Sequence, residues 1–153
     1  AFAAGRFADS GARSVRRTID VSGDGPNNMG GPVAEIRDAL VADGIVINGL
    51  PILDQSTGPF SRYNIPNLDL YYRDCVIGGP AAFIVVAEDF AAFASAIRRK
   101  LILEIAGLAP PARPVRAAHT AAPLQLAQAV DEPRVSPPCD IGEELLRSRN
   151  EDF

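Results

Sequence analysis

Three short apolar stretches separated by glycine-rich turns and helical patterns dominate the first two thirds of the chain. Residues 15–21, 45–50 and 83–86 are rich in β-branched side chains, which is typical of strands. The stretch 45–50 is nearly continuously apolar and predicts a strand buried on both faces, as in a parallel sheet. Residues 15–21 also look central in this interpretation, so we expect a neighbouring strand that the sequence does not supply and an uncovered sheet edge.

Helical patterns lie before and between these stretches. Residues 1–13 predict a helix that ends near Gly11. A second helix is expected to begin at Pro32, because proline suits the first helical position, and to end at Gly44 in the left-handed conformation. Together with the strands on either side, this helix forms a βαβ unit, whose crossover should be right-handed.

Two further helices are expected after a proline-containing excursion at 51–66. Asn67 is a suitable cap for a short helix that continues to about Val76. The longest helix follows Glu88 and Asp89 and ends at Gly107. Its apolar positions are expected to trace one buried face: Phe90, Phe93, Ala94, Ile97, Leu101 and Ile105.

These elements predict an α/β fold, a doubly wound and mostly parallel sheet that is incomplete in this chain. The ordered domain is expected over residues 1–107. Residues 108–153 begin with a stretch rich in alanine and proline without a sustained period, which indicates a flexible tail. Asp140 to Arg149 predict a short terminal helix within it.

The length and net charge of the chain argue against some classes of function. The chain has 153 residues, enough for one domain, and its net charge of −4 argues against a nucleic-acid partner. It contains no apolar run of about 18 residues, so no membrane span is predicted. The first residues resemble the middle of a helix and not a signal peptide, so we expect the chain to be part of a longer protein.

The loop after the first predicted strand carries the candidate chemistry. Its sequence is Ser22-Gly23-Asp24-Gly25-Pro26-Asn27-Asn28. Ligands of open α/β sheets bind at the carboxyl ends of strands, so Asp24 and Ser22 could supply oxygens to Mg²⁺ or Mn²⁺. The alternative is a loop aspartate that hydrogen-bonds its own turn. The loop lacks the Gly-x-x-x-x-Gly-Lys pattern of a phosphate-binding loop.

Three other polar residues need an explanation. Asp20 lies within a predicted strand, where a charge needs a partner, and Arg16 or Arg17 is the expected one. Cys75 and Cys139 are the only cysteines. If the parent protein is exported, a disulfide between them would close a loop of about 64 residues, worth roughly 4 kcal/mol. Two free or buried thiols are the alternative.

Several blocks of sequence resemble a known family, and they occur in its order. They are Ile19–Asn28, Asp43–Ile52, Tyr71–Pro80, Phe83, and Phe90 through Gly107. These blocks resemble bacterial proteins of the uncharacterised DUF1194 family, which are similar to von Willebrand factor A (vWA) domains. The resemblance covers roughly residues 1–107 and leaves the tail outside.

The resemblance implies a divalent cation on top of a doubly wound sheet. In vWA domains, the cation is held by an Asp-x-Ser-x-Ser motif, a later Thr, and an Asp in a strand-end segment that Ser22 to Gly25 resembles. Asp24 is the ligand that carries over, although the inserted Gly23 departs from the usual segment. The other two elements would precede residue 1, so the resemblance implies a carboxyl-terminal half that binds metal weakly or not at all by itself.

The preferred hypothesis is a non-enzymatic protein-binding module. As the resemblance implies, its parent would hold a partner's carboxylate through the cation and would be periplasmic or secreted. One alternative is a metal-dependent hydrolase or phosphotransferase that uses Asp20 or Asp24, with Asp54 or Glu88 as a second acid or base. Another is a structural assembly fragment that associates through its exposed sheet edge.

Overall fold

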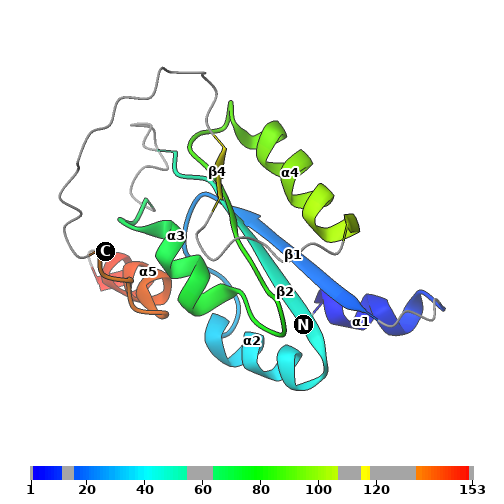
Figure 1. Ribbon diagram of the computed structural model, residues 1–153. Helices are drawn as coiled ribbons and strands as arrows, with labels where there is room; N and C mark the ends of the chain where they lie inside the picture. Colours follow the sequence, from blue (N-terminus) through cyan, green and yellow to red (C-terminus); the bar gives the residue numbers. More distant parts are fainter. Residues whose placement is uncertain (1, 12–15, 55–63, 107–114, 118–133, 152–153) are drawn as a thin grey trace, which may run out of the picture.

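Parallel strands and the helices that connect them organise the chain (Figure 1). The computed structural model describes the following residues: 2–11, 16–54, 64–106, 115–117 and 134–151. Strand β1 (Arg17–Gly23) pairs in parallel with β2 (Ile45–Pro51), from Arg17 opposite Ile45 to Gly23 opposite Pro51. The predicted combination of helices with a parallel, open sheet is therefore confirmed.

A second parallel pair continues the arrangement. Strand β3 (Val85–Ala87) pairs with β4 (Val115–Ala117). Isolated parallel bridges join Gly49 to Ile84 and Ile52 to Ala87, so β3 runs beside β2. Because these strands run in one direction, their carboxyl ends, and the loops that follow them, lie at one edge of the sheet.

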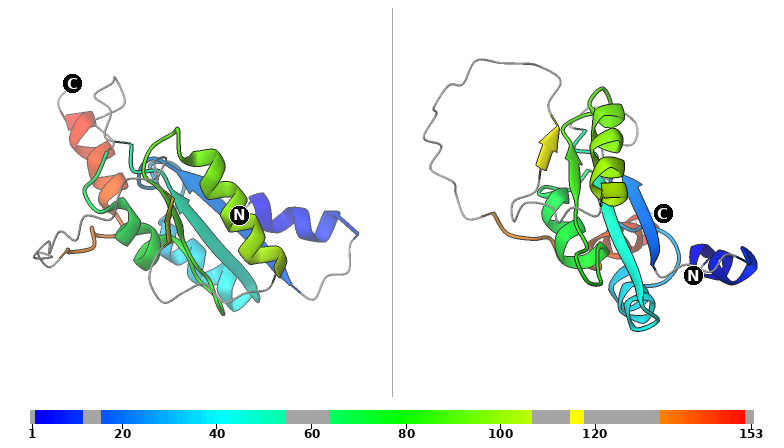
Figure 2. Two further views of the ribbon diagram at one scale, coloured as in Figure 1. Left: turned by 45° about the horizontal axis from the view of Figure 1, so that its top comes forward. Right: turned by 45° about the vertical axis from the view of Figure 1, so that its right-hand side comes forward.

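The helices cover both sides of the strands. Helix α2 (Val33–Ala42) and α3 (Leu68–Tyr71), which continues as a π-helical turn over Tyr72–Val76, lie on one side, and α4 (Phe93–Ala106) lies on the other (Figures 1 and 2). Helix α1 (Phe2–Asp9) lies beside β1 and buries none of its residues. Among the described helices, none combines the length and apolarity that crossing a bilayer requires.

Alternation along β3 divides the core into two clusters. Val85 and Ala87 pack towards α4, whereas Ile84 and Val86 pack towards α3 and the π-helical turn. The second cluster contains the aromatic side chains of Tyr71 and Tyr72, both almost fully buried. Strand β2 lies between the clusters and is buried along nearly its whole length, as its continuous apolar sequence predicts.

Within the described residues, strand β1 lies at a sheet edge, in agreement with the predicted uncovered edge, but it is less buried than its predicted central position implies. Within the described part of the chain it pairs with β2 on one side, and all of its residues are exposed or half-buried. Only Ile19 and Val21 present apolar side chains in this strand. Polar residues alternate with them, so one face of β1 is apolar and the other is not.

The predicted apolar face of the longest helix is only partly buried: Phe93 and Ile97 are half-buried and pack against the core, but the most buried positions are others. In α4, Ala96 and Lys100 are buried together with Ala92 just before it, whereas Phe90 is 54 % and Ile105 84 % exposed. The small alanines allow the helix to approach the sheet closely, and Lys100 then reaches a carboxylate on β1. Hydrophobic periodicity alone could not indicate this, because the buried row is made of alanines and a lysine.

Two local expectations have different outcomes. Gly44 closes α2 with φ +72°, and its N–H donates to the carbonyl of Val41, which confirms the left-handed cap. Asn67 precedes α3 as expected, but its side chain makes no capping hydrogen bond. Its backbone is itself left-handed, and its amide bonds Arg134 and Val135 instead.

The region beyond residue 107 contains structured parts. Strand β4 pairs with β3, and residues 134–151 lie against the domain and include the predicted terminal helix, α5 (Ile141–Glu151). In the described parts, a freely flexible tail is therefore the wrong description, because ion pairing and a disulfide hold the chain there. Residues 107–114 and 118–133, where the flexible tail is also predicted, lie outside the described residues.

Candidate functional site

The candidate site begins where β1 ends. Ser22 is the penultimate residue of the strand and Asp24 is the first residue of the loop to α2, and both are exposed. Between them, Gly23 passes close to the π-helical turn: a β-carbon there would lie 2.8 Å from the hydroxyl oxygen of Tyr72. The glycine that departs from the family pattern therefore has a packing reason.

A cavity of about 550 Å³ lies beside this loop. Its volume falls within the range of roughly 300–1,000 Å³ that is common for ligand pockets. Valine side chains supply the apolar part of the wall, and the described lining residues include no Lys, Arg or His. The lining is Val21 to Asn28, Val33, Asn64, Tyr71, Tyr72 and Val76. With Asp24 as its carboxylate, the cavity favours a cation or a neutral hydrogen-bonding group.

Two tyrosines form the inner wall. The Tyr71 hydroxyl accepts a hydrogen bond from the Asn27 N–H at 3.0 Å. Burial raises the pKa of both phenols, and for Tyr72 the neighbouring Tyr71 and Asp24 add to the rise. Both phenols therefore remain protonated at neutral pH.

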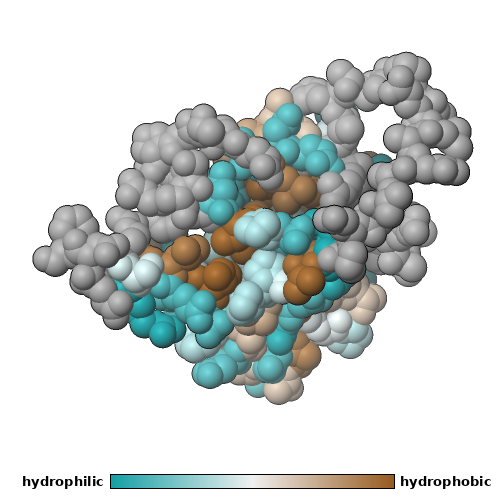
Figure 3. All heavy atoms as spheres, turned by 90° about the vertical axis from the view of Figure 1, so that its left-hand side faces the viewer, coloured by the Kyte–Doolittle hydropathy of each residue, from teal (hydrophilic) through white to brown (hydrophobic). Residues whose placement is uncertain are grey.

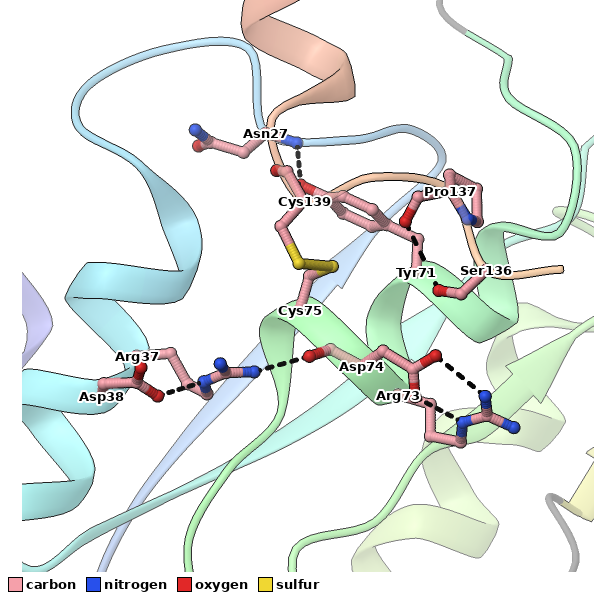
Figure 4. Close-up of a disulfide and its surroundings, with 10 residues drawn as sticks. All are labelled: Asn27, Arg37, Asp38, Tyr71, Arg73, Asp74, Cys75, Ser136, Pro137 and Cys139. Carbon is pink, nitrogen blue, oxygen red and sulfur yellow. Dashed lines mark hydrogen bonds and ion pairs between the residues drawn. A yellow bond between two sulfur atoms is a disulfide. The ribbon is translucent and has the colours of Figure 1, made fainter.

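The outer side of the loop is held by the carboxyl-terminal segment. The Asn27 amide donates to Gly31 and, at 2.7 Å, to a carboxylate oxygen of Glu143 in α5. Cys75 and Cys139 form a disulfide beside this contact (Figure 4). Sequence reasoning missed Asn27, Tyr71 and Glu143 as parts of the site, because their contacts join segments that are far apart along the chain.

The donor set fits part of a cation shell. Asp24 supplies a carboxylate and Ser22 a hydroxyl, which are hard oxygen ligands suited to Mg²⁺ or Mn²⁺. Within the residues that the structure describes, no group of three or more His, Cys, Asp or Glu side chains is placed to hold a metal ion. A cation at Asp24 would therefore depend on oxygens from water or from a partner.

The Asp20 side chain is not part of the site around Asp24. The prediction that Arg16 or Arg17 is its partner is wrong. Its carboxylate pairs with Lys100 of α4, which also contacts Glu104 at 2.6 Å. The two candidate arginines bond backbone carbonyls instead: Arg16 that of Glu104, and Arg17 that of Asp43. Lys100 is only 4 % exposed, so the network ties β1 to α4 beneath the loop.

The fold and the loop cavity define the class of the protein, an α/β domain with parallel strands and a polar cavity at the carboxyl end of β1. Residues 1–109 match the family described as "Protein of unknown function (DUF1194)", and the chain belongs to that family. The family resemblance of the sequence blocks is thus confirmed. No curated protein and no solved structure matches the chain.

Proposed function

We propose that this chain is a non-enzymatic, vWA-like protein-binding domain whose ligand-binding end is the carboxyl edge of β1. The observation that carries the proposal is the exposed carboxylate of Asp24 at the cavity on that edge. Parallel strands with helices on both sides support a doubly wound arrangement similar to that of vWA domains.

In this proposal, Asp24 contacts Mg²⁺ or Mn²⁺ directly or through water in the complete parent domain, with Ser22 beside it, and this chain alone binds the ion weakly or not at all. A bound cation would supply positive charge next to an otherwise acidic cavity. An acidic side chain of the partner protein could then approach Asp24 without repulsion. The Asn28 amide and the protonated Tyr72 hydroxyl at the cavity wall offer further hydrogen-bonding groups to the partner.

The disulfide supports an exported parent. Disulfides persist in oxidising compartments such as the bacterial periplasm or the extracellular medium. The pairing of Cys75 with Cys139 is consistent with a periplasmic or secreted protein. Pairing with Lys100 argues against Asp20 as the acid or base of the hydrolase alternative.

Paramagnetic Mn²⁺ broadening of amide resonances tests the proposal at low affinity. Small additions of Mn²⁺ should selectively broaden the amides of Ser22 to Gly25, because broadening depends steeply on distance from the ion. Asp24→Asn should abolish this effect with little change in side-chain volume. Asp38→Asn is the matched control, since Asp38 is an exposed aspartate of α2 paired with Arg37.

Two outcomes would contradict the proposal. One is broadening of the loop amides that persists in Asp24→Asn, which would place the ion elsewhere. The other is equal broadening around all surface carboxylates. Concentration-dependent self-association without any Mn²⁺ effect would instead favour the assembly hypothesis, in which the exposed edge of β1 pairs with other chains.

A further inference from the structure

Residues 134–148 form a segment that packs against the outer side of the candidate site. This segment is called the clamp below. Its first attachment is ionic. Arg134 donates to both carboxylate oxygens of Asp69, at 2.9 and 2.5 Å, and Asp69 is only 1 % exposed. Asn67 accepts from Arg134 and donates to the carbonyl of Val135. The start of the clamp is thus fixed to α3.

The second attachment is covalent. Cys139 lies just before α5, and Cys75 lies in the π-helical turn that follows α3, so the disulfide joins the clamp to the wall of the cavity (Figure 4). The Tyr71 hydroxyl also points at the carbonyl of Cys139, at 3.5 Å. Cys75 is buried, whereas Cys139 is half-buried, so Cys139 is the more exposed residue of the two.

The third attachment reaches the loop that carries Asp24. Gly142 lies so close to Asn27 that a β-carbon at position 142 would overlap the Asn27 carbonyl oxygen. Beside it, Glu143 accepts from the Asn27 amide, while its second carboxylate oxygen is buried and has no hydrogen-bond partner among the described residues. Burying a carboxylate costs free energy unless donors satisfy it. The hydrogen bond between the Glu143 carboxylate and the Asn27 amide therefore stabilises the positions of both the clamp and the loop.

We propose that the clamp regulates the candidate site, with the Cys75–Cys139 disulfide as a redox-sensitive latch that keeps the β1–α2 loop fixed. The role of the clamp as a regulator rests on the proposed function of the Asp24 edge. No clamp residue lines the cavity, so the clamp acts by holding Asn27 and not by blocking entry. Figure 3, seen from the α3 and α5 side of Figure 1, shows hydrophobic patches there broken up by hydrophilic side chains.

Release of the latch is a two-electron thiol–disulfide exchange with a dithiol reductant. One reductant thiolate attacks the sulfur of Cys139, and Cys75 departs as a thiolate that takes up a proton. The second reductant thiol then displaces Cys139. Two electrons and two protons pass to the cysteines, and the reductant leaves as its own disulfide. The ionic attachment at Arg134 remains, so the clamp opens without leaving the domain.

Hydrogen exchange of the full chain, without added cation, tests the latch. Dithiothreitol should speed exchange of the Asn27 backbone amide by at least about tenfold, because this N–H donates to Tyr71 and the Asn27 side chain loses its hydrogen bond to the Glu143 carboxylate. Amides of β2 should keep their protection. Cys139→Ser should show the fast loop exchange without reductant and no further change with it.

A second variant tests the loop contact while the disulfide is intact. Gly142→Ala should displace α5 from Asn27 and speed loop exchange under oxidising conditions. Gly5→Ala is its matched control, because nothing lies within 4 Å of a β-carbon at that helical glycine.

Unchanged loop exchange after both thiols are shown to be free would overturn the latch. So would loss of protection in β2 together with the loop, because the disulfide would then maintain the whole fold. This measurement contains no Mn²⁺, so its outcome is independent of the broadening experiment. If both succeed, reduction should also weaken the broadening at Ser22 to Gly25.

Discussion

Replacing Lys100 by methionine tests whether a buried ion network fixes β1, the strand that carries the candidate site. The Lys100 ammonium lies between Asp20 and Glu104, whose side chains are 48 % and 19 % exposed. Glu104 also accepts from the Asn48 amide at 2.7 Å. Methionine keeps the length and apolar stem of lysine but removes the charge shared by both carboxylates.

The expected loss follows from this geometry. Removing one partner of a fully buried ion pair costs roughly 3–5 kcal/mol. Asp20 is half in water and recovers hydration, and Glu104 keeps Asn48 as a donor, so the loss should be smaller. We therefore expect Lys100→Met to lower the free energy of unfolding by about 2–3 kcal/mol.

Urea unfolding followed by circular dichroism would measure this as a lower midpoint at an unchanged slope. Glu104→Leu alone should also be destabilising, because it leaves the lysine with one half-hydrated carboxylate. The double variant Lys100→Met/Glu104→Leu replaces the pair by apolar side chains. Its loss of unfolding free energy should be smaller than the sum of the two single losses by about 1 kcal/mol or more.

Arg73→Met provides the matched control. Arg73 pairs with Asp74 at 2.6 Å, but both side chains are substantially exposed, so its removal should cost less than about 1 kcal/mol. The reasoning fails if Lys100→Met costs no more than Arg73→Met. It also fails if the two single losses simply add, because the lysine and glutamate would then act independently.

Three further predictions concern backbone space and pH. Gly49→Ala should lower the unfolding free energy by about 1–3 kcal/mol in urea, because its β-carbon would lie 2.9 Å from side-chain carbons of Ile77 and Tyr72. Gly44→Ala should cost about 1 kcal/mol in the same assay, since φ is +72° there, although a β-carbon would make only an ordinary contact, 3.5 Å from a guanidinium nitrogen of Arg17. Burial raises the pKa of Tyr72, so the unfolded chain loses that proton first, and stability should fall as pH rises above about 10. Urea midpoints from pH 8 to 11 should fall less steeply in Tyr72→Phe, and an identical slope would contradict this cause.

Local signals were sufficient for most of the elements. The continuous apolar run of β2 predicts its burial between two layers, and Gly44 predicts the end of α2, because both depend on neighbouring residues alone. The buried row of α4 could not be predicted in this way. Lys100 can be buried because Glu104, one turn further along the helix, and Asp20, 80 residues away in sequence, both supply carboxylates.

The candidate site also has some features that the local sequence predicts and others that depend on residues far apart in the chain. The position of Asp24 and Ser22 after a strand follows from the loop sequence and the parallel pairing of β1 with β2. The contacts that hold the cavity wall do not, because Tyr71 and Asn27 of the wall and Glu143 outside it meet across as many as 116 residues. The alanine- and proline-rich composition near residue 110 indicates a flexible tail. This composition does not predict that residues 134–148 pack against the domain.

Because the chain returns to the domain at Arg134, the end of the family match does not coincide with the end of the packed structure. The family match ends at residue 109, yet the buried carboxylate of Asp69 has its bidentate arginine at position 134. Cys75 has its covalent partner at position 139. A fragment cut at the family boundary would lose both and expose the apolar surface around Tyr71 that Cys139 and Ile141 now cover. The packed structure of this chain therefore extends beyond the family match, and we expect a fragment cut at residue 109 to be less stable and more prone to aggregation than the full chain.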